Sequence, residues 1–481
     1  MKINKLTYIL LAGAIITASC KKVFLDEQPT LSVTVTQSIK TPNDLADAVN
    51  GMYNSMKQTT LFGRDIPVLG DLLADNTYVN QSNSGRYLND NNYTFATSTS
   101  AEASNIYSQG YYAILQANRV IYEGQKIGNS ADVSQLVGEA YTARALIYLE
   151  LVNWFGAPYT VSPNADGVPL VTVPSYVTGF SLQPKRASVS AVYTKIISDL
   201  DSAYAIMPTT NTTLHAINSD YVAKYAAKAI EARAYLYKGD YANARDAALL
   251  VVNGGGYSLA TTASAFTAFW SSPSATTTKL EKIFELNQNA SSNIGNTGLD
   301  AIFSQAGYGD IQATTDLYNS YTITDLRRTL IINGTRAGAQ AYIINKFSNY
   351  SNTDKDETPV IRYAEVILTL AESYARLGDE TNAKVYLNQL AKLRDPSLTA
   401  GYTSTGAQLI TDILNERRKE LAFEGLRFFD FTRLNLTINR PAQPQGYASY
   451  PVVTTSDFKR ILPIPQSARD ANTNLTQNPG Y

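Results

Sequence analysis

Apolar residues recur every three to four positions over several stretches of this chain, which is the spacing of one face of an α-helix. The first stretch covers residues 42–56, where Leu45 and Val49 fall on the same face. Thr41 is suited to cap this helix, because Asp44 follows three residues later and a proline occupies the first helical position. The same periodicity predicts helices over residues 133–154 and 189–207.

An internal repeat gives the clearest sign of architecture. Residues 232–240 read ARAYLYKGD and residues 371–379 read AESYARLGD, with Ala244 and Ala383 at matching positions beyond them. Each copy is typical of a helix that ends at a glycine and is followed by a second helix packed back against the first. This is tetratricopeptide-like geometry. We therefore expect a mostly α fold built from helical pairs.

Two stretches lack helical periodicity. Residues 76–99 are crowded with Asn, Ser and Tyr, and residues 253–349 contain three consecutive glycines and runs of Thr and Ser. Long loops inside a compact domain are usually functional. We predict a single domain over residues 20–481, in which the helical scaffold lies mainly at 40–252 and 356–434 and the stretch 253–349 is a loop-rich insert that binds the ligand.

Residues 1–19 have the features of a secretory signal. Two lysines precede an apolar run too short to span a bilayer, and small residues follow before Cys20. Cys20 is the only cysteine, so it can form no internal disulfide, and its position resembles a bacterial lipobox, with Thr17 where leucine is usual. We expect Cys20 to be acylated and to anchor the protein to a membrane. The alternative is an ordinary free or buried cysteine in a secreted protein.

Composition and charge exclude some classes of partner. The formal net charge is -1 and 17% of residues are charged, so no basic surplus is available to neutralise a nucleic-acid backbone. The chain has 33 Tyr against 15 Phe and 2 Trp. Tyrosine rings can stack on a ligand while their hydroxyls remain hydrated.

Few residues could support catalysis or hold a metal. His215 is the only histidine, and we expect it on the surface or beside a helix. A site built on two histidines is therefore impossible, and neither a phosphate-binding glycine loop nor a dinucleotide fingerprint is present. We expect no cofactor and no metal.

Three glutamates form the one candidate for chemistry between paired carboxylates. Glu416, Glu420 and Glu424 are four residues apart and share a helix face. A glycosidase needs two carboxylates on opposite sides of the bond that it cleaves, and a single helix face supplies this poorly. Arginines and a lysine lie between the glutamates, which favours salt bridges. We predict a structural role and no enzymatic activity.

Motifs along the whole chain resemble those of one family. They are Phe24-Leu25-Asp26 with Pro29, Asn50-Gly51-Met52-Tyr53, residues 117–121, residues 138–145 leading to Phe155-Gly156-Ala157-Pro158, residues 362–368, residues 416–430 with Arg433, Leu462-Pro463-Ile464-Pro465, and residues 477–481. In order and coverage these segments resemble the SusD/RagB family of outer-membrane lipoproteins.

The resemblance implies a superhelix of stacked tetratricopeptide-like pairs. It also implies a binding protein, often for oligosaccharides, that forms a lid over a SusC-like TonB-dependent transporter at the outer membrane. The expected partners are that transporter, a glycan or other oligomeric nutrient, and the membrane through the lipid anchor, with no nucleic acid. The family's motif residues imply contacts between helices rather than with ligand; here they are Arg362, Glu365, Glu416, Glu420, Glu424 and Arg433.

We place the ligand site where the two loop-rich stretches meet. A sugar site needs aromatic platforms beside amide, carboxylate or guanidinium groups, and both stretches offer them. The candidates are Tyr78, Asn80, Arg86, Tyr87, Trp270, Tyr308 and Asp310. Trp270 is the sharpest choice, although Phe266 and Phe269 could make it part of a hydrophobic plug. Trp154 lies near a scaffold motif, so we expect it in the core.

Two other functions stay open at this stage. A peptide-binding or protein-binding module of the RagB type would use a long groove or an exposed strand edge instead of an aromatic pocket. A hydrolase would need two carboxylates from different segments converging in a cleft, and the sequence indicates no such pair.

Overall fold

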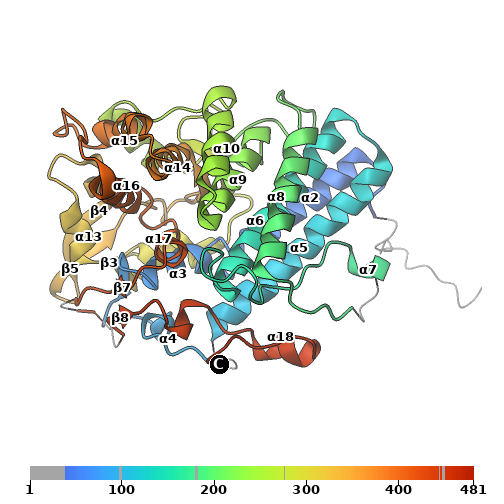
Figure 1. Ribbon diagram of the computed structural model, residues 1–481, viewed down its shortest axis with the longest axis horizontal. Coiled ribbons are helices and arrows are strands. Elements are labelled where there is room, and N and C mark those ends of the chain that lie inside the picture. The colour runs from blue at the N-terminus through green and yellow to red at the C-terminus, as the bar shows by residue number, and fades with distance from the viewer. Residues whose placement is uncertain (1–37, 97–99, 179–181, 276, 444, 447–449) are drawn as a thin grey trace, which may run out of the picture. The chain divides into compact units, whose positions relative to one another are not determined.

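The computed structural model describes the chain from residue 38 to residue 481, apart from 97–99, 179–181, 276, 444 and 447–449. The signal segment 1–19, Cys20 and the motif at 24–29 lie outside the described residues. Residues 41–481 form one compact unit, which is mostly helical, as expected (Figure 1).

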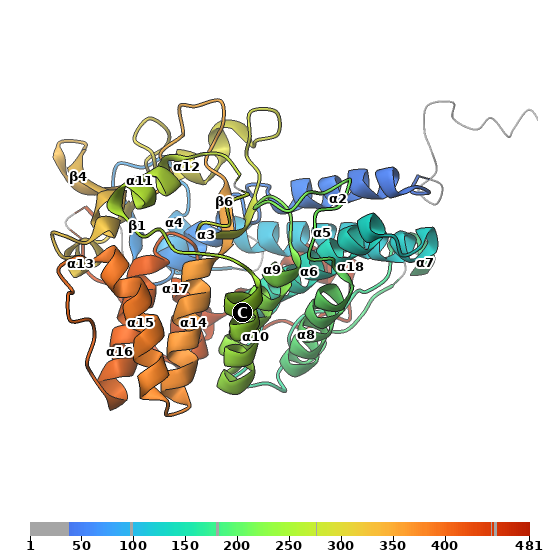
Figure 2. The same ribbon diagram turned by 90° about the horizontal axis from the view of Figure 1, so that it is seen from above.

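Most of the long helices pack in chain order, each against the next. Contacts run from α2 to α5, α6, α8, α9 and α10, and then to α14, α15 and α16. In Figure 2 the later helices of this series stand in a row. Their bounds are α2 Pro42–Met56, α5 Ala101–Ile127, α6 Ala131–Phe155, α8 Val189–Ile206, α9 Lys224–Lys238, α10 Tyr241–Gly254, α14 Tyr363–Arg376, α15 Glu380–Arg394 and α16 Gly406–Glu420.

The first helix begins where its sequence signals predict. The N–H of Asp44 donates to Thr41 Oγ1 at 3.2 Å, and the N–H of Thr41 donates to Asp44 Oδ2 at 2.9 Å. This reciprocal pair satisfies two backbone donors that the helix itself leaves without partners. Local sequence therefore fixes the start of α2.

Both copies of the repeat form the predicted helical hairpins. Gly239 and Gly378 follow the first helix of each pair and have φ angles of +76° and +85°, which glycine adopts at little cost. The side chains of Asp240 and Asp379 then cap the second helices, α10 and α15, by accepting backbone N–H groups. The same short signal thus ends one helix and starts the next in both places.

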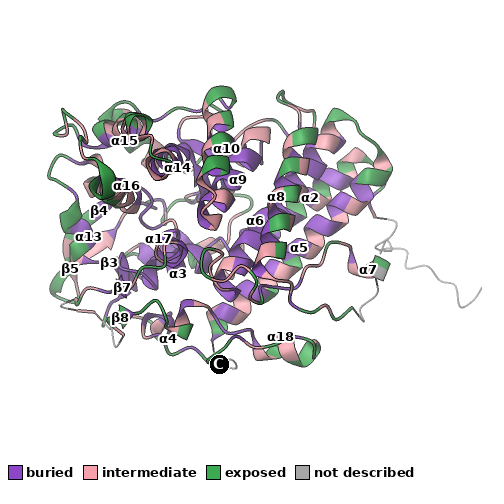
Figure 3. Ribbon diagram, in the orientation of Figure 1, coloured by how far each residue is buried: buried purple, intermediate pink, exposed green. Residues whose placement is uncertain are grey.

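The predicted core tryptophan is buried. Trp154 is fully inaccessible, with its ring stacked on Phe428 at 5.6 Å and in edge contact with Phe429 at 4.7 Å. Figure 3 shows that helix α6, which carries Trp154, is covered along most of its length. Among the described residues, no helix has the length and apolar character needed to cross a membrane.

The stretch 253–349 contains more regular structure than its composition predicts. It supplies three strands of a four-stranded antiparallel sheet with the order β1-β3-β5-β4. The three strands from this stretch are β3 Ile311–Ala313, β4 Ile331–Arg336 and β5 Ala339–Ile344, and the fourth strand of the sheet is β1 Thr77–Val79. Strands of three to six residues are too short to show a clear alternation in sequence, so loop composition dominated the prediction.

The remaining elements are short. A second antiparallel pair joins β2 Lys282–Leu286 to β6 Thr358–Arg362, and a third joins β7 Ile438–Asn439 to β8 Val452–Val453. The other helices are α3 Asp65–Leu72, α4 Leu88–Asn91, α7 Ser175–Thr178, α11 Ala263–Ser271, α12 Leu299–Phe303, α13 Thr315–Ser320, α17 Arg427–Arg433 and α18 Gln466–Ala471, with 3-10 turns at Gly295–Thr297, Leu326–Leu330 and Phe458–Arg460.

Candidate functional site

Strand pairing brings the two loop-rich stretches together, as the sequence predicted. Tyr78 on β1 lies opposite Gln312 on β3, and the backbone N–H of Asn80 donates to the Asp310 carbonyl at 2.9 Å. The Tyr78 hydroxyl and the Asn80 amide both donate to Gln312 Oε1, at 3.1 and 3.0 Å. Tyr78, Asn80 and Asp310 are all buried. They hold the two segments together.

Asp310 also organises the loop that follows β1. Its Oδ1 accepts the N–H of Ser84 at 3.0 Å, and its Oδ2 accepts the Ser84 hydroxyl. Arg336, on β4, donates to the Tyr308 carbonyl at 2.8 Å and lies 3.6 Å from the Asp310 carboxylate. Sequence reasoning missed Arg336, because its role depends on β4 lying beside these loops.

Of the six candidate residues in these two loops, Arg86 and Tyr308 are the ones that are partly exposed. The Arg86 guanidinium lies 3.7 Å from the centroid of the Tyr308 ring. One Arg86 nitrogen donates to the Ser84 hydroxyl at 2.5 Å. A guanidinium over an aromatic ring makes an amphipathic surface, because it combines a π system with several N–H donors.

Tyr87 points into the protein. Its side chain is buried, with the hydroxyl donating to Asp65 Oδ1 at 2.5 Å and accepting from Arg64 Nε at 2.8 Å. Burial, together with the Asp65 carboxylate, raises the pKa of Tyr87 well above its ordinary value. Tyr87 therefore orients the loop, and its ring is not presented to solvent.

Trp270 lies among a different group of residues. Lys346 Nζ is 4.4 Å and the Arg362 guanidinium 5.0 Å from its ring, while Phe266 and Phe269 make edge contacts with it. The hollow beside it measures about 20 Å³, which is room for about one water. Within the described part of the chain, its contacts are with this group and with none of the other six candidates. Trp270 is therefore packed between two phenylalanine rings and two basic side chains.

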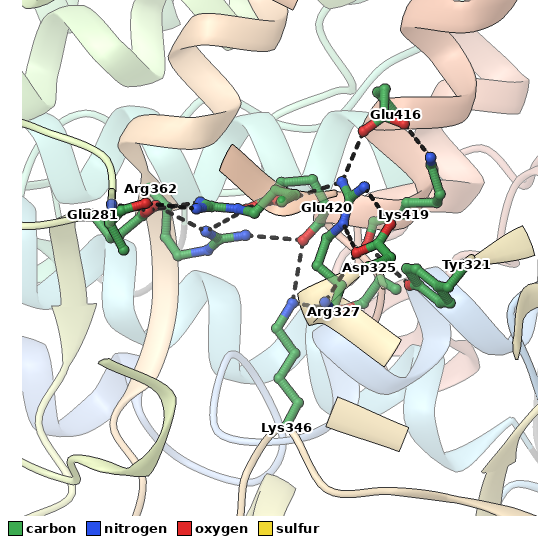
Figure 4. A network of polar contacts seen from close by, with 12 residues as sticks. Glu281, Tyr321, Asp325, Arg327, Lys346, Arg362, Glu416, Lys419 and Glu420 are labelled. Carbon is green, nitrogen blue, oxygen red and sulfur yellow. Dashed lines mark hydrogen bonds and ion pairs between the residues drawn. The ribbon is translucent and has the colours of Figure 1, made fainter. Parts of the chain in front are cut away.

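The side chains of the three glutamates of the acidic segment are almost fully buried in ion pairs, as the interleaved basic residues predicted, and Figure 4 shows those of Glu416 and Glu420. Arg327 lies 2.9 Å from Glu416, Arg362 lies 3.1 Å from Glu420, and Arg362 also reaches Glu424 at 2.6 Å. Burial alone would raise the pKa of Glu420, but the surrounding arginines hold it below its ordinary value. Each of the three carboxylates is therefore engaged in an ion pair with a basic side chain.

The other scaffold residues implied by the family motifs also join separate helices. Arg233 on α9 binds Glu365 on α14, at 2.5 and 2.8 Å. Arg433 on α17 binds Glu372 on α14, at 2.6 and 2.8 Å. These bidentate pairs fix the angle between helices as well as their distance.

A second acidic group offers the atoms of a metal site. Carboxylate oxygens of Asp220, Glu285 and Glu357 all lie within 4.8 Å of one another. Lys282 pairs with Glu285 at 2.8 Å, and burial with the Asp220 hydrogen bond raises the pKa of Glu357 to about 11. Lys282 and a proton retained on Glu357 therefore offset part of the negative charge of these three carboxyl groups.

The expectation that His215 lies on the surface is wrong. It is buried, and its Nδ1 lies 3.0 Å from both oxygens of Glu139. Tyr53 and Gln135 also donate to Glu139, each at 2.8 Å. The sequence around His215 does not indicate this burial, because the partner Glu139 is distant in the chain.

The helical series and the two loops joined by the β1–β3 pairing define a tetratricopeptide-like helical repeat protein. A family model described as "SusD family" matches residues 329–481, and one described as "Starch-binding associating with outer membrane" matches residues 23–236. The chain belongs to the SusD/RagB family.

Known relatives are similar to this chain over all or most of its length. SusD-like protein P2 of Formosa agariphila is 27% identical, with all of both chains covered. Solved structures of SusD superfamily proteins from Bacteroides vulgatus and Bacteroides thetaiotaomicron are 26% and 27% identical, with TM-scores of 0.81 and 0.80. The alignments cover 92% and 91% of this chain and all of those chains.

Proposed function

We propose that this protein is an outer-membrane lipoprotein that binds an oligosaccharide and delivers it to a SusC-like TonB-dependent transporter. The description of the matched family model, starch-binding and associated with the outer membrane, supports this role. The predicted acylation of Cys20 would supply the anchor. We infer that the protein binds its ligand without converting it, and the ion pairs that engage the buried carboxylates of Glu416, Glu420 and Glu424 support this inference.

The cation–π pair of Arg86 and Tyr308 is the observation that carries this proposal. A sugar ring has apolar C–H faces and a rim of hydroxyls, so it suits a surface that combines an aromatic ring with fixed donors. The side chains sit 3.7 Å apart on loops joined by the β1–β3 pairing. Ligand binding would therefore meet a surface that is already ordered, which lowers its entropic cost.

The other candidate residues take different parts in this proposal. Asn80, Asp310, Tyr78 and Tyr87 are buried, so they position the loops rather than contact the ligand. Trp270 stands apart, against Lys346 and Arg362.

Binding measurements on the soluble protein lacking the signal and Cys20 test the proposal. Titration calorimetry with a panel of neutral and acidic oligosaccharides and of short peptides should give heat with at least one glycan. Arg86→Ala and Tyr308→Ala should each weaken that binding at least about tenfold, equivalent to about 1.4 kcal/mol. Tyr112→Ala is the matched control, because this tyrosine is 54% exposed on α5 and belongs to no cluster described above.

The panel also separates the glycan proposal from the peptide alternative. Binding of peptides with no glycan bound would replace it with a RagB-like peptide-binding function. Hydrolysis of a bound glycan, seen as new reducing ends, would contradict the non-enzymatic role. Co-purification of the native lipoprotein with a TonB-dependent transporter from detergent-solubilised outer membranes tests the delivery step.

A further inference from the structure

A cavity beside the C-terminal half of α2 combines amides, an aromatic ring and balanced charges. It measures about 200 Å³, several times the roughly 30 Å³ that one water occupies in the liquid. Its walls come from α2, from the segment that precedes α9 and from the loop after β2. None of the seven residues selected from the sequence lines it.

Three asparagines on its wall have hydrogen-bonding capacity to spare. Asn50 and Asn54 are one helical turn apart on α2, both exposed, and their carboxamides have no partner among the described residues. The side-chain oxygen of Asn289, Oδ1, accepts from the backbone N–H and the hydroxyl of Ser291, which leaves the side-chain N–H₂ of Asn289 available. A carboxamide both donates and accepts, as a hydroxyl does, so these groups suit a ligand rich in hydroxyls.

Tyr221 supplies an aromatic ring, and a second ring packs against it. The buried His215 ring stacks on it, with 3.9 Å between centroids and 15° between planes. Glu139 in turn holds His215 Nδ1, at 3.0 Å. Tyr221 is half-buried and is one of the residues that line the cavity, together with Tyr53, whose ring centroid lies 6.0 Å from that of Tyr221. Such a ring can pack against the C–H face of a sugar.

The charges on the wall balance one another. Lys57 is buried and donates to the hydroxyl and carbonyl oxygens of Ser292, at 2.7 Å for the hydroxyl. Burial lowers the pKa of Lys57, and the Asp220 and Glu357 carboxyl groups oppose that effect. Asp220 accepts a hydrogen bond from the Asn287 amide. Lys57 is the basic residue of the cavity wall, and it already donates to Ser292. The cavity therefore suits a neutral ligand better than an anionic one.

We propose that this cavity binds one neutral sugar ring, as a site separate from the Arg86–Tyr308 surface. The inference rests on the proposed function, that the protein binds glycans. Tyr221 stacks on the ring, while Asn50, Asn54 and Asn289 bond its hydroxyls. A glycan bound at both places would be held by two contacts on one chain, and its apparent affinity would exceed that of either site.

A cavity-filling variant tests this site without disturbing the core. Asn54→Trp places an indole in the cavity from an exposed position, and Asn43→Trp makes the same change on an exposed part of the same helix that lies outside the cavity. The probes are methyl glycosides of glucose, galactose, mannose, xylose and N-acetylglucosamine, together with methyl glucuronide. Their binding is followed by saturation-transfer difference NMR, with circular dichroism to verify folding.

We expect at least one neutral methyl glycoside to receive saturation from the wild type and from Asn43→Trp. A neutral methyl glycoside should still bind to the Arg86→Ala/Tyr308→Ala double variant, which lacks the other sugar surface, and adding Asn54→Trp to that variant should weaken the remaining binding at least about tenfold. Tyr221→Leu should weaken it as well, because the stacking ring is lost.

Three results would overturn the inference. They are no binding of any neutral glycoside to the wild type, binding to the Arg86→Ala/Tyr308→Ala double variant that survives the addition of Asn54→Trp, and preference for the glucuronide. If oligosaccharides still bind and depend on Arg86 and Tyr308, the proposed function stands and only this cavity site is lost. If no oligosaccharide binds either, the proposed function fails with it.

Discussion

Arg362, the residue that immediately precedes α14, donates two hydrogen bonds to Glu424, at 2.9 and 2.6 Å. Both side chains are almost fully buried, and Lys346 lies 2.6 Å from the same carboxylate. This contact joins the second repeat pair to the segment that follows α16. A buried bidentate pair of this kind stabilises the fold chiefly because either partner left alone would be an uncompensated charge.

We predict that Glu424→Gln destabilises the protein by about 3 to 5 kcal/mol at pH 7. Burial opposes ionisation of Glu424, but Arg362 and Lys346 hold its pKa below the ordinary value of 4.5. Its contribution to stability is therefore present above pH 4.5 and is lost as the pH falls through the lower folded-state pKa. Urea unfolding at pH 7 and pH 4 measures this, and an equal loss at both values would contradict it.

Glu150 should show the opposite behaviour. Burial raises its pKa to about 7 from an ordinary 4.5, despite the nearby Arg233. The folded state then binds this proton more tightly than the unfolded state, so stability falls as the pH rises from 4.5 to 7. Glu150→Gln removes that penalty and should stabilise the protein at pH 8 by up to about 3 kcal/mol, with little effect at pH 4. Melting temperatures of the wild type and Glu150→Gln at pH 4 and pH 8 test this prediction. Glu424→Gln, which should be destabilised at neutral pH, is the contrasting variant.

Trp270→Ala distinguishes a packing role from a binding role. We expect glycan affinity within about twofold of the wild type, because Trp270 contacts Phe266, Lys346 and Arg362 beside a hollow of about 20 Å³. Stability should fall by about 2 kcal/mol, less than for a fully buried tryptophan because the ring is half-buried. A tenfold loss of affinity in a folded variant would place Trp270 in the ligand site.

Cys20→Ala should release the protein from the membrane fraction. The prediction rests on the short apolar run that ends just before the only cysteine. Fractionation of cells, with mass spectrometry of the mature N-terminus for an acylated Cys20, is the measurement. Lys21→Ala is the matched control and should remain in the membrane. Retention of Cys20→Ala in the membrane would contradict lipid anchoring.

Local sequence determined the helical scaffold, because helix starts and ends depend on residues a few positions apart. Thr41 with Asp44 predicted the start of α2, and the Gly-Asp pairs at 239–240 and 378–379 predicted both hairpins. The charge pattern around Glu420 also predicted ion pairs. It could not predict that Arg327, Arg362 and Arg394 would be the partners.

Tertiary structure alone decided the rest, since those contacts join residues far apart in the chain. Tyr78 meets Gln312 across more than two hundred residues, and this pairing sets where Arg86 and Tyr308 lie. Composition could group Trp270 with these loops, but packing placed it against Lys346. His215 is buried because the fold brings Glu139 to its Nδ1 at 3.0 Å, and no local pattern encodes a distance of that kind.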